Sequence, residues 1–389
     1  MSKNNLMNTY GRFDVTFEKG IGTKLYDVNG KEYLDFVSGV AVNCLGHSPA
    51  AIINAIEKQS KNLIHVSNYY WNTEHTALAE KLSNNCHHNK VFFCNSGTEA
   101  VEAALKIARK YGKLKSNKNK NILLYMDNSF HGRTIGALTV TGQEKYQKDF
   151  LPLMDGVKKV KFNSIEDLNK NFNENVCGII IEPIQGEGGI NIAHTEFLKE
   201  SRKLCDKFNA LLIFDEVQCG IGRLGSLFAY KKFGVIPDVI CIAKALGGGF
   251  PIGAVLANET ASQAFVPGDH GSTFGGNPLA CAVSLAVLTE LVDKGIINKI
   301  EEKSTYLKEK LNNLKDKYNV IDEVKGMGLL IGISIKVDVK DFINLCFKNG
   351  LLVVSAGTNV VRLLPPLNVS KAEIDEALNI LEIVINKFS

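Results

Sequence analysis

ALLIFD, at residues 210–215, is a run of five apolar residues that ends in an acid. A short run that is apolar throughout is typical of a strand buried on both faces of a sheet. Four other runs have the same character: VFFC (91–94), NILLYM (121–126), GIIIEP (178–183) and VICIA (239–243). Amphipathic stretches at 99–111 and 196–208 lie between them and are expected to be helices. Strands that alternate with helices predict a mostly parallel sheet covered on both faces, with a ligand at the carboxyl ends of the strands.

The C-terminal third mixes helices with short strands. We expect helices at about 278–318, 339–349 and 370–387, and strands in LLVVS (351–355) and VVRLLP (360–365). Near the N-terminus, alternating residues around Asn29 and Gly30 predict a β-hairpin. The expected organisation is an α/β protein with a large domain over residues 51–280 and a smaller α+β domain formed by residues 1–50 and 281–389.

The composition restricts the classes of partner. The 389 residues carry 45 basic and 41 acidic side chains, and a net charge of +4 is too small a surplus for a typical nucleic-acid binder. The nine cysteines show neither paired nor metal-ligand spacing, which favours free thiols in a reducing cytoplasm and no metal site. Residues 1–13 lack the apolar core of a signal peptide, and no apolar run approaches the ~20 residues of a membrane span. We expect a cytoplasmic protein without nucleic-acid or membrane partners.

Ser96, Gly97 and Thr98 stand between a predicted strand and a predicted helix. Ser96 with Glu99 three residues later is a helix capping box, which alone explains both residues. In the alternative interpretation, the glycine lets the backbone approach a ligand, and the free N–H groups of the helix start bind a phosphate. Both interpretations remain open at this point.

Phe130 and Arg133, in FHGRT (130–134), follow another predicted strand. They are compatible with surface packing. They are also compatible with a ring stacked on a planar cofactor and a guanidinium aimed at a carboxylate. His131 lies between them, and we expect it to be a structural, hydrogen-bonding histidine.

Asp215 and Lys244 are charged residues at the ends of buried strands. An unpaired buried carboxylate is costly, so Asp215 needs a helix cap, a salt bridge or a protonated pyridine nitrogen as its partner. Lys244 precedes three glycines, whereas a P-loop places its lysine after them. Burial lowers the pKa of a lysine and makes its neutral amine a nucleophile. Combined with a phosphate cradle and a stacking ring, these are the groups that a pyridoxal-phosphate enzyme needs.

Longer segments resemble those of the class III, or ω-amino-acid, aminotransferases, which depend on pyridoxal 5′-phosphate. The similarity extends from Tyr10 to about Leu378. It is carried by FVSGVAVNCLGH, VFFCNSGTEAVEAALKIARKY, SFHGRT, EPIQGEGG, LLIFDEVQCGIGRLG, AKALGGGFPIGA, HGSTFGGNP and VRLLPPLNVS. Cys219 departs from the family pattern, which usually has threonine there. The resemblance implies fold type I of the pyridoxal-phosphate-dependent transferases.

The resemblance also implies roles toward the cofactor. Lys244 is expected to carry pyridoxal phosphate as a Schiff base and to move a proton at the reacting carbon, and Asp215 to pair with the pyridinium nitrogen. Gln218 is expected to bind the phenolic oxygen, and Phe130 to stack on the ring. The expected phosphate ligands are Ser96, Gly97, Thr98 and, from the neighbouring subunit, Thr273. A homodimer would therefore share its active sites.

Substrate binding is implied for four residues. Arg133 is expected to bind the carboxylate remote from the reacting amine, and Arg362 the α-carboxylate of glutamate. Glu187 is expected to neutralise Arg362 while an ω-amine is bound, although the pair is also compatible with a structural salt bridge. Ser272 is expected to contact substrate.

Within the class, the segments are most similar to the enzymes that use N-acetylornithine. The implied reaction transfers its δ-amine to 2-oxoglutarate by a ping-pong mechanism, in arginine biosynthesis. The open alternatives for the donor are ornithine, succinylornithine, 4-aminobutyrate and N-succinyl-diaminopimelate. An intramolecular aminomutase and a phosphate-ligand-binding protein without turnover are more distant alternatives.

Overall fold

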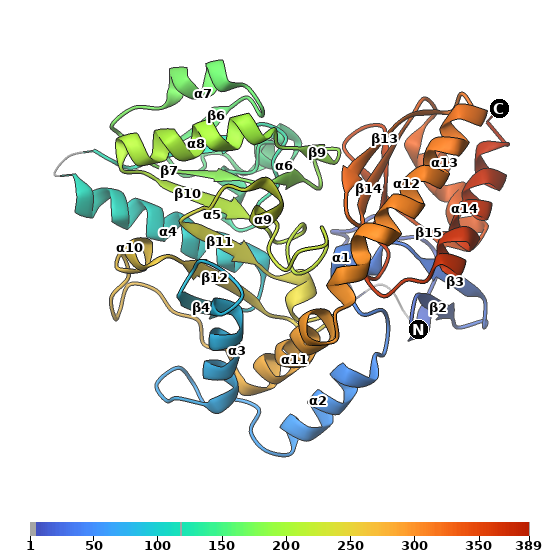
Figure 1. Cartoon of the computed structure of the whole chain (residues 1–389), viewed down its shortest axis with the longest axis horizontal. Coiled ribbons are helices and arrows are strands. Elements are labelled where there is room, and N and C mark those ends of the chain that lie inside the picture. Colours follow the sequence, from blue (N-terminus) through green and yellow to red (C-terminus); the bar gives the residue numbers. More distant parts are fainter. Residues whose placement is uncertain (1–4, 117–118, 389) are drawn as a thin grey trace.

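The computed structural model describes residues 5–116 and 119–388 (Figure 1). Its largest sheet has seven strands in the order β4-β12-β11-β10-β7-β5-β6. The central strand β10 (Leu211–Asp215) pairs in parallel with β7 (Val176–Ile181) on one side and with β11 (Val239–Ile242) on the other. The remaining strands are β4 (Lys90–Cys94), β5 (Ile122–Met126), β6 (Val157–Val160) and β12 (Gly253–Ala257).

All five predicted strands are therefore present, and the α/β class with a mostly parallel sheet is confirmed. The sequence did not indicate β6 or β12. β6 lies at the sheet edge and reads VKKV with two exposed lysines, so it lacks the apolar signature. β12 runs antiparallel to both of its neighbours, β4 and β11.

Two helices cover opposite faces of this sheet. Leu211 and Ile213 pack in the core cluster of α4 (Gly97–Lys115), whereas Leu212 and Phe214 pack in that of α8 (Thr195–Phe208). Side chains alternate between the faces of a strand, so an uninterrupted apolar run serves both layers. The charged residue that ends such a strand lies at its carboxyl end, and in β10 this residue is the buried Asp215.

A second region contains the antiparallel sheet β13-β14-β17-β16. Its strands are β13 (Ile321–Met327), β14 (Leu330–Ile335), β16 (Val354–Ala356) and β17 (Val360–Leu363). Its helices are α12 (Ile300–Lys317), α13 (Val339–Lys348) and α14 (Lys371–Ile385). The expected strand LLVVS is divided at Val353, because β15 (Leu351–Leu352) joins a different sheet.

That other sheet carries the N-terminal segment, with strands β1 (Phe17–Ile21), β2 (Lys24–Asp27) and β3 (Glu32–Asp35). The predicted hairpin around Asn29 and Gly30 is confirmed, since β2 and β3 pair antiparallel across it. Leu34 of β3 pairs in parallel with Leu351 of β15, so the N-terminal and C-terminal segments share one sheet. The domain boundaries at 50/51 and 280/281 stay predictions.

The expected helix at 278–318 is interrupted, which corrects that prediction. α11 (Pro278–Leu288) continues as a π-helical turn over Thr289–Asp293, and a 3-10 turn at Ile296–Lys299 leads into α12. Gly295 between them has a φ of 73°. This left-handed conformation, which favours glycine, ends one helix before the next begins.

Short elements complete the described chain. They are α1 (Ser38–Ala41), α2 (Ala50–Ser60), α3 (Thr73–Ser83), α5 (Ile135–Thr139), α6 (Glu144–Gln147), α7 (Ile165–Asn171), α9 (Tyr230–Phe233), α10 (Glu259–Ser262), β8 (Ile184–Gln185), β9 (Asn191–Ile192) and 3-10 turns at Lys148–Phe150 and Lys244–Leu246. All nine cysteines are unpaired. Among the described helices, none has both the length and the apolarity needed to cross a membrane.

Candidate active site

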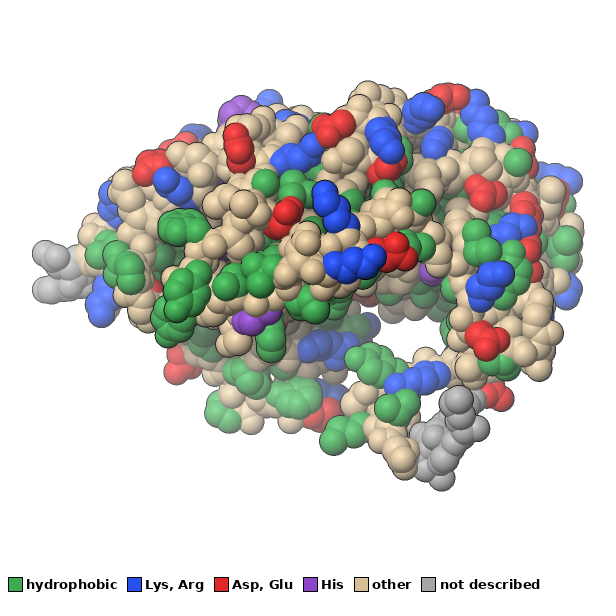
Figure 2. All heavy atoms as spheres, turned by 90° about the horizontal axis from the view of Figure 1, so that it is seen from below, with side chains coloured by type: hydrophobic (Ala, Val, Ile, Leu, Met, Phe, Trp, Pro, Cys, Tyr) green, Lys and Arg blue, Asp and Glu red, His purple; other side chains and the backbone are tan. Residues whose placement is uncertain are grey.

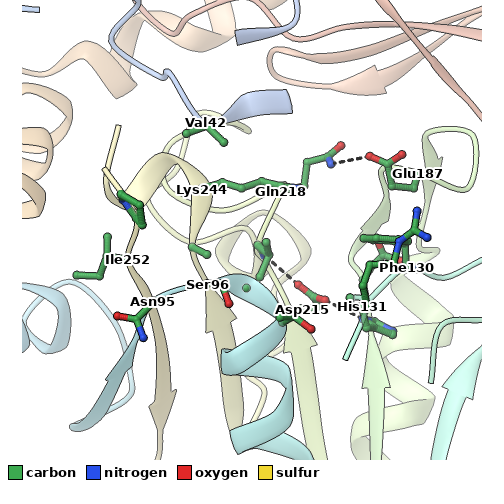
Figure 3. Close-up of a pocket in the computed structure, with 18 of the residues that line it drawn as sticks. Val42, Asn95, Ser96, Phe130, His131, Glu187, Asp215, Gln218, Lys244 and Ile252 are labelled. Carbon is green, nitrogen blue, oxygen red and sulfur yellow. Dashed lines mark hydrogen bonds and ion pairs between the residues drawn. The ribbon is translucent and has the colours of Figure 1, made fainter. Parts of the chain in front are cut away.

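A cavity of about 440 Å³ opens at the carboxyl ends of β4, β5, β7, β10 and β11 (Figure 3). Its volume is within the range of small-molecule sites. Most of the predicted site residues line it together: Ser96, Gly97, Thr98, Phe130, Arg133, Glu187, Asp215, Gln218 and Lys244. The carboxyl edge of the sheet is thus where the structure gathers these side chains, as the strand pattern predicts.

Lys244 follows β11 and begins a 3-10 turn. Its φ of 46° is unusual for a residue with a side chain and typical of strained functional positions. Burial lowers the pKa of Lys244; the nearby carboxylate of Glu187 partly offsets this effect, and the charge of Arg362 reinforces it. A lowered pKa increases the fraction of neutral, nucleophilic amine.

Asp215 ends β10 and is buried. Its Oδ2 lies 2.7 Å from Nδ1 of His131, and its Oδ1 accepts a hydrogen bond from the backbone N–H of Val217 at 3.0 Å (Figure 3). His131 is buried as well, and its Nε2 has no partner among the described residues. Two contacts use only part of the acceptor capacity of a carboxylate, so Asp215 can accept a further donor from a ligand.

Glu182 is a buried acid at this site that the sequence analysis did not single out. It follows β7 and accepts a hydrogen bond from the backbone N–H of Phe130 at 2.9 Å. Burial raises the pKa of Glu182 well above its ordinary value, and the charge of Asp215 adds to the effect. The signal that indicated Asp215, an acid that ends a buried apolar strand, is equally present in GIIIEP (178–183).

Arg362 reaches the site from β17 in the other region of the protein. Its Nη1 donates to Oε1 of Glu187 at 2.6 Å, to Oε1 of Gln218 at 2.8 Å and to the carbonyl of Gly186 at 2.9 Å. Burial alone would raise the pKa of Glu187, but the charge and hydrogen bond of Arg362 outweigh it and lower that pKa. The buried Arg362 and the partly exposed Glu187 therefore form an ion pair near Lys244.

Arg133 contrasts with Arg362, because it is exposed and makes neither a hydrogen bond nor an ion pair with any described residue. Its guanidinium carbon lies 4.2 Å from the ring centre of Tyr146 and 5.6 Å from that of Phe130. The five N–H donors of this guanidinium are therefore free to bind a carboxylate.

The start of α4 is capped by Ser96, and the interpretation of residues 96–98 as phosphate ligands stays a prediction. Ser96 is the N-cap, and its Oγ accepts from the N–H of Glu99 at 3.3 Å, while Glu99 accepts from the N–H of Asn95 at 2.9 Å. A Cβ on Gly97 would lie 2.7 Å from Cγ1 of Val217. Close packing thus excludes a side chain at Gly97, and the helix start lines the cavity where its amides can meet an anion.

Ser272 and Thr273 do not line this cavity. Ser272 Oγ accepts from Nδ2 of Asn95 at 3.1 Å and from the N–H of Gly275 at 3.0 Å, and Thr273 is exposed. Their expected roles toward substrate and cofactor stay predictions.

The family model described as aminotransferase class-III matches residues 6–385. The chain belongs to this family. It is 63% identical, over 98% of its length, to the acetylornithine aminotransferase of Clostridium acetobutylicum, and covers 99% of that protein. It is 44% identical to the succinylornithine transaminase of Photorhabdus laumondii, with 94% of this chain and 92% of that protein covered.

Solved structures agree with the family. The ornithine aminotransferase of Toxoplasma gondii superposes with a TM-score of 0.94 at 31% identity, covering 99% of this chain and 93% of that one. The acetylornithine aminotransferase of Elizabethkingia anophelis gives 0.87 at 34% identity, covering 99% and 97%. Class-III aminotransferases depend on pyridoxal phosphate and act on small amino and oxo acids. The α/β fold of this class-III aminotransferase is that of its family.

Proposed function

We propose that the protein is an N-acetylornithine aminotransferase. It transfers the δ-amine of N2-acetyl-L-ornithine to 2-oxoglutarate, giving N-acetyl-L-glutamate 5-semialdehyde and L-glutamate, a step of arginine biosynthesis in the cytoplasm. One observation carries the proposal. Two arginines in opposite states serve the cavity that Lys244 lines: Arg362 is neutralised by Glu187, and Arg133 has free donors. The 63% identity to an acetylornithine aminotransferase supports the choice of donor.

The described residues fit pyridoxal 5′-phosphate. Lys244 would hold the cofactor through Nζ, and the carboxylate of Asp215 would accept a hydrogen bond from the protonated ring nitrogen. The N–H groups at the helix start near Gly97 would bind the phosphate. Phe130 would lie against the ring, and Gln218 would bind the phenolic oxygen. When bound, the cofactor supplies an electron sink for the negative charge that develops on the substrate carbon.

Lys244 would move the proton. Its Nζ would act as the base at the reacting carbon, and the lowered pKa suits this role. Asp215 is held in place by His131 and the Val217 amide, so its charge stays directed into the cavity. Glu182 fixes the backbone of Phe130 and thereby the start of the segment that carries Arg133.

The two arginines would bind different carboxylates of the substrates. In the first half-reaction, Arg133 binds the carboxylate of N-acetylornithine, and the ω-amine brings no negative charge to Arg362. Glu187 then neutralises Arg362, since an unpaired buried guanidinium would be costly. In the second half-reaction, 2-oxoglutarate brings a second carboxylate, which replaces Glu187 at Arg362.

A homodimer would complete the site. Large apolar side chains are exposed around the loop of Ser272 and Thr273: Tyr69 at 92%, Tyr70 at 67%, Trp71 at 87% and Phe274 at 61%. Asn68 ties the two segments by donating to the carbonyls of Ser272 and Gly275 at 3.0 and 2.9 Å. Hydrophobic side chains gather in a broad area on the face shown in Figure 2. Exposed aromatic patches of this kind mark protein interfaces.

A donor panel with 2-oxoglutarate at one fixed concentration tests the proposal. We expect N-acetylornithine to give a higher kcat/KM than ornithine, succinylornithine, 4-aminobutyrate or N-succinyl-diaminopimelate. In the absence of 2-oxoglutarate, the donor should bleach the absorbance of the holoenzyme, and 2-oxoglutarate should restore it. A higher kcat/KM for another donor would replace the proposed substrate. Absorbance that no amine changes would contradict turnover altogether.

A further inference from the structure

Tyr146 forms an aromatic support for Arg133 that neither the strand pattern nor the family motifs indicated. The guanidinium carbon of Arg133 lies 4.2 Å from the Tyr146 ring centre. The rings of Tyr146 and Phe130 meet edge to face, with centres 5.7 Å apart and planes at 77°. Tyr146 does not itself line the cavity, but it contacts Arg133 and Phe130, which do.

The chain holds Tyr146 firmly in this position. It lies in the single turn of α6, and glutamine side chains fix both flanks of that turn. Gln143 Nε2 donates to the two carbonyls of residues 128–129, each at 3.3 Å. Gln147 Nε2 donates to the two carbonyls of residues 138–139, at 3.0 and 3.1 Å. The Tyr146 ring is therefore anchored to the same segment that carries Phe130 and Arg133.

An aromatic support is suited to an arginine that must receive a carboxylate. A long exposed arginine side chain samples many rotamers, and ordering it on binding weakens affinity. An acidic neighbour would order it but would occupy its donors. A ring face attracts the guanidinium without using any N–H group, so the fork stays free for a bidentate contact.

We propose that Tyr146 is a positioning residue that holds the Arg133 guanidinium ready for the substrate carboxylate. Tyr146 thereby sets the KM of both substrates that present a carboxylate to Arg133. This inference rests on the proposed function, because it requires that N-acetylornithine and 2-oxoglutarate both use Arg133.

Replacement of the ring tests the inference. Tyr146→Leu and Tyr146→Met should each raise the KM of N-acetylornithine and of 2-oxoglutarate by about three- to tenfold, the range expected for losing a partly desolvated cation–ring contact. We expect kcat to stay within about twofold, because no group at the reacting carbon changes. Tyr146→Phe keeps the ring and should have the same KM values as the wild type for both substrates. The dissociation constant of glutarate, a dicarboxylate without a reacting group, should rise in parallel with the KM values.

Two comparisons show that the effect passes through Arg133. N-acetylputrescine is the donor without the carboxylate, and its kcat/KM should be the same in Tyr146→Leu and in the wild type. In an Arg133→Ala background, Tyr146→Leu should produce no additional rise in KM. Tyr306 serves as a control in α12, since Lys371 and Lys310 lie over its ring at 5.3 and 5.4 Å; Tyr306→Leu should leave both KM values unchanged.

The outcomes separate this inference from the proposed function. If Arg133→Ala leaves both KM values unchanged, the assignment of the carboxylate site fails, and the role of Tyr146 fails with it. If Arg133→Ala raises both values but neither Tyr146→Leu nor Tyr146→Met does, only the role of Tyr146 is wrong. Equal effects of Tyr146→Leu with and without the Arg133 side chain would show a structural role instead. Thermal melting and cofactor absorbance identify any variant that fails to fold; if Tyr146→Leu fails, Tyr146→Met decides.

Discussion

Lys244 has a strained, left-handed backbone conformation, and burial lowers the pKa of its side-chain amine. Lys244→Ala removes the only proton carrier assigned to the reacting carbon, so we expect kcat to fall by at least about 10³-fold. Steady-state kinetics measure this change, and Lys203→Ala, at an exposed lysine on α8, is the matched control. Borohydride reduction followed by peptide mapping should place the pyridoxyl group on Lys244. Turnover of Lys244→Ala at the wild-type rate would exclude the assignment.

Glu187 is the residue whose removal should change the balance between substrates. In Glu187→Gln the buried guanidinium of Arg362 loses its negative partner, which penalises the state that binds an ω-amine donor. The ratio of kcat/KM for glutamate to that for N-acetylornithine should therefore rise by roughly tenfold. Glu200→Gln, at a partly exposed position of α8 outside the cavity, should leave the ratio unchanged. An unchanged ratio in Glu187→Gln would show that the ion pair is only structural.

The sequence indicated nine of the twenty residues that line the cavity, because strand ends and family motifs both point to them. Tyr146 was not indicated, since its role depends on contact across a short turn rather than on any strand pattern. Glu182 was missed although the pattern marked it. The ion pair of Arg362 and Glu187 could be expected only from the resemblance, because the two residues are 175 positions apart in the sequence.

The start of helix α4 is the element on which the proposed phosphate site depends. An alanine Cβ at Gly97 would meet Val217 Cγ1 at 2.7 Å, so the helix or Val217 must shift. Overpacking of this kind costs about 1–3 kcal/mol, and we expect Gly97→Ala to lower the free energy of unfolding by that amount and to weaken cofactor binding. Denaturant unfolding and cofactor titration measure both effects. Adding Val217→Ala should restore much of the loss; a double variant no better than Gly97→Ala would rule out steric conflict as the cause.

Apolar runs predicted five strands of the large sheet, because these strands pack apolar side chains on both faces. The pattern failed where burial is one-sided or brief, and it also missed the antiparallel β12, which is buried throughout. β6 exposes its lysines, and the short β15 and β16 join two different sheets within one apolar run. Gly295 interrupts a helical pattern whose apolar residues continue on both sides of it. Such breaks depend on backbone conformation and tertiary pairing, which a window of sequence does not contain.

For the whole molecule, the proposed dimer makes a prediction that a single subunit cannot test. If Thr273 binds the cofactor phosphate in the neighbouring subunit, each active site takes its Lys244 from one chain and its Thr273 from the other. Lys244→Ala and Thr273→Asp homodimers should both be inactive, because one lacks the amine and the other repels the phosphate. In a mixed dimer one site keeps both native residues. A 1:1 mixture of refolded subunits should therefore recover about a quarter of wild-type activity, from random pairing.

A second mixture provides the control for this recovery. It combines Lys244→Ala subunits with Asp215→Asn subunits. Each of these residues lines the cavity of its own chain, so every site in the mixed dimers keeps one defect. No activity should return. Recovery with Thr273→Asp but not with Asp215→Asn assigns Thr273 to the neighbouring site, which agrees with its exposure outside its own cavity. No recovery with Thr273→Asp would place its action within its own subunit, and an active Thr273→Asp homodimer would remove Thr273 from the site.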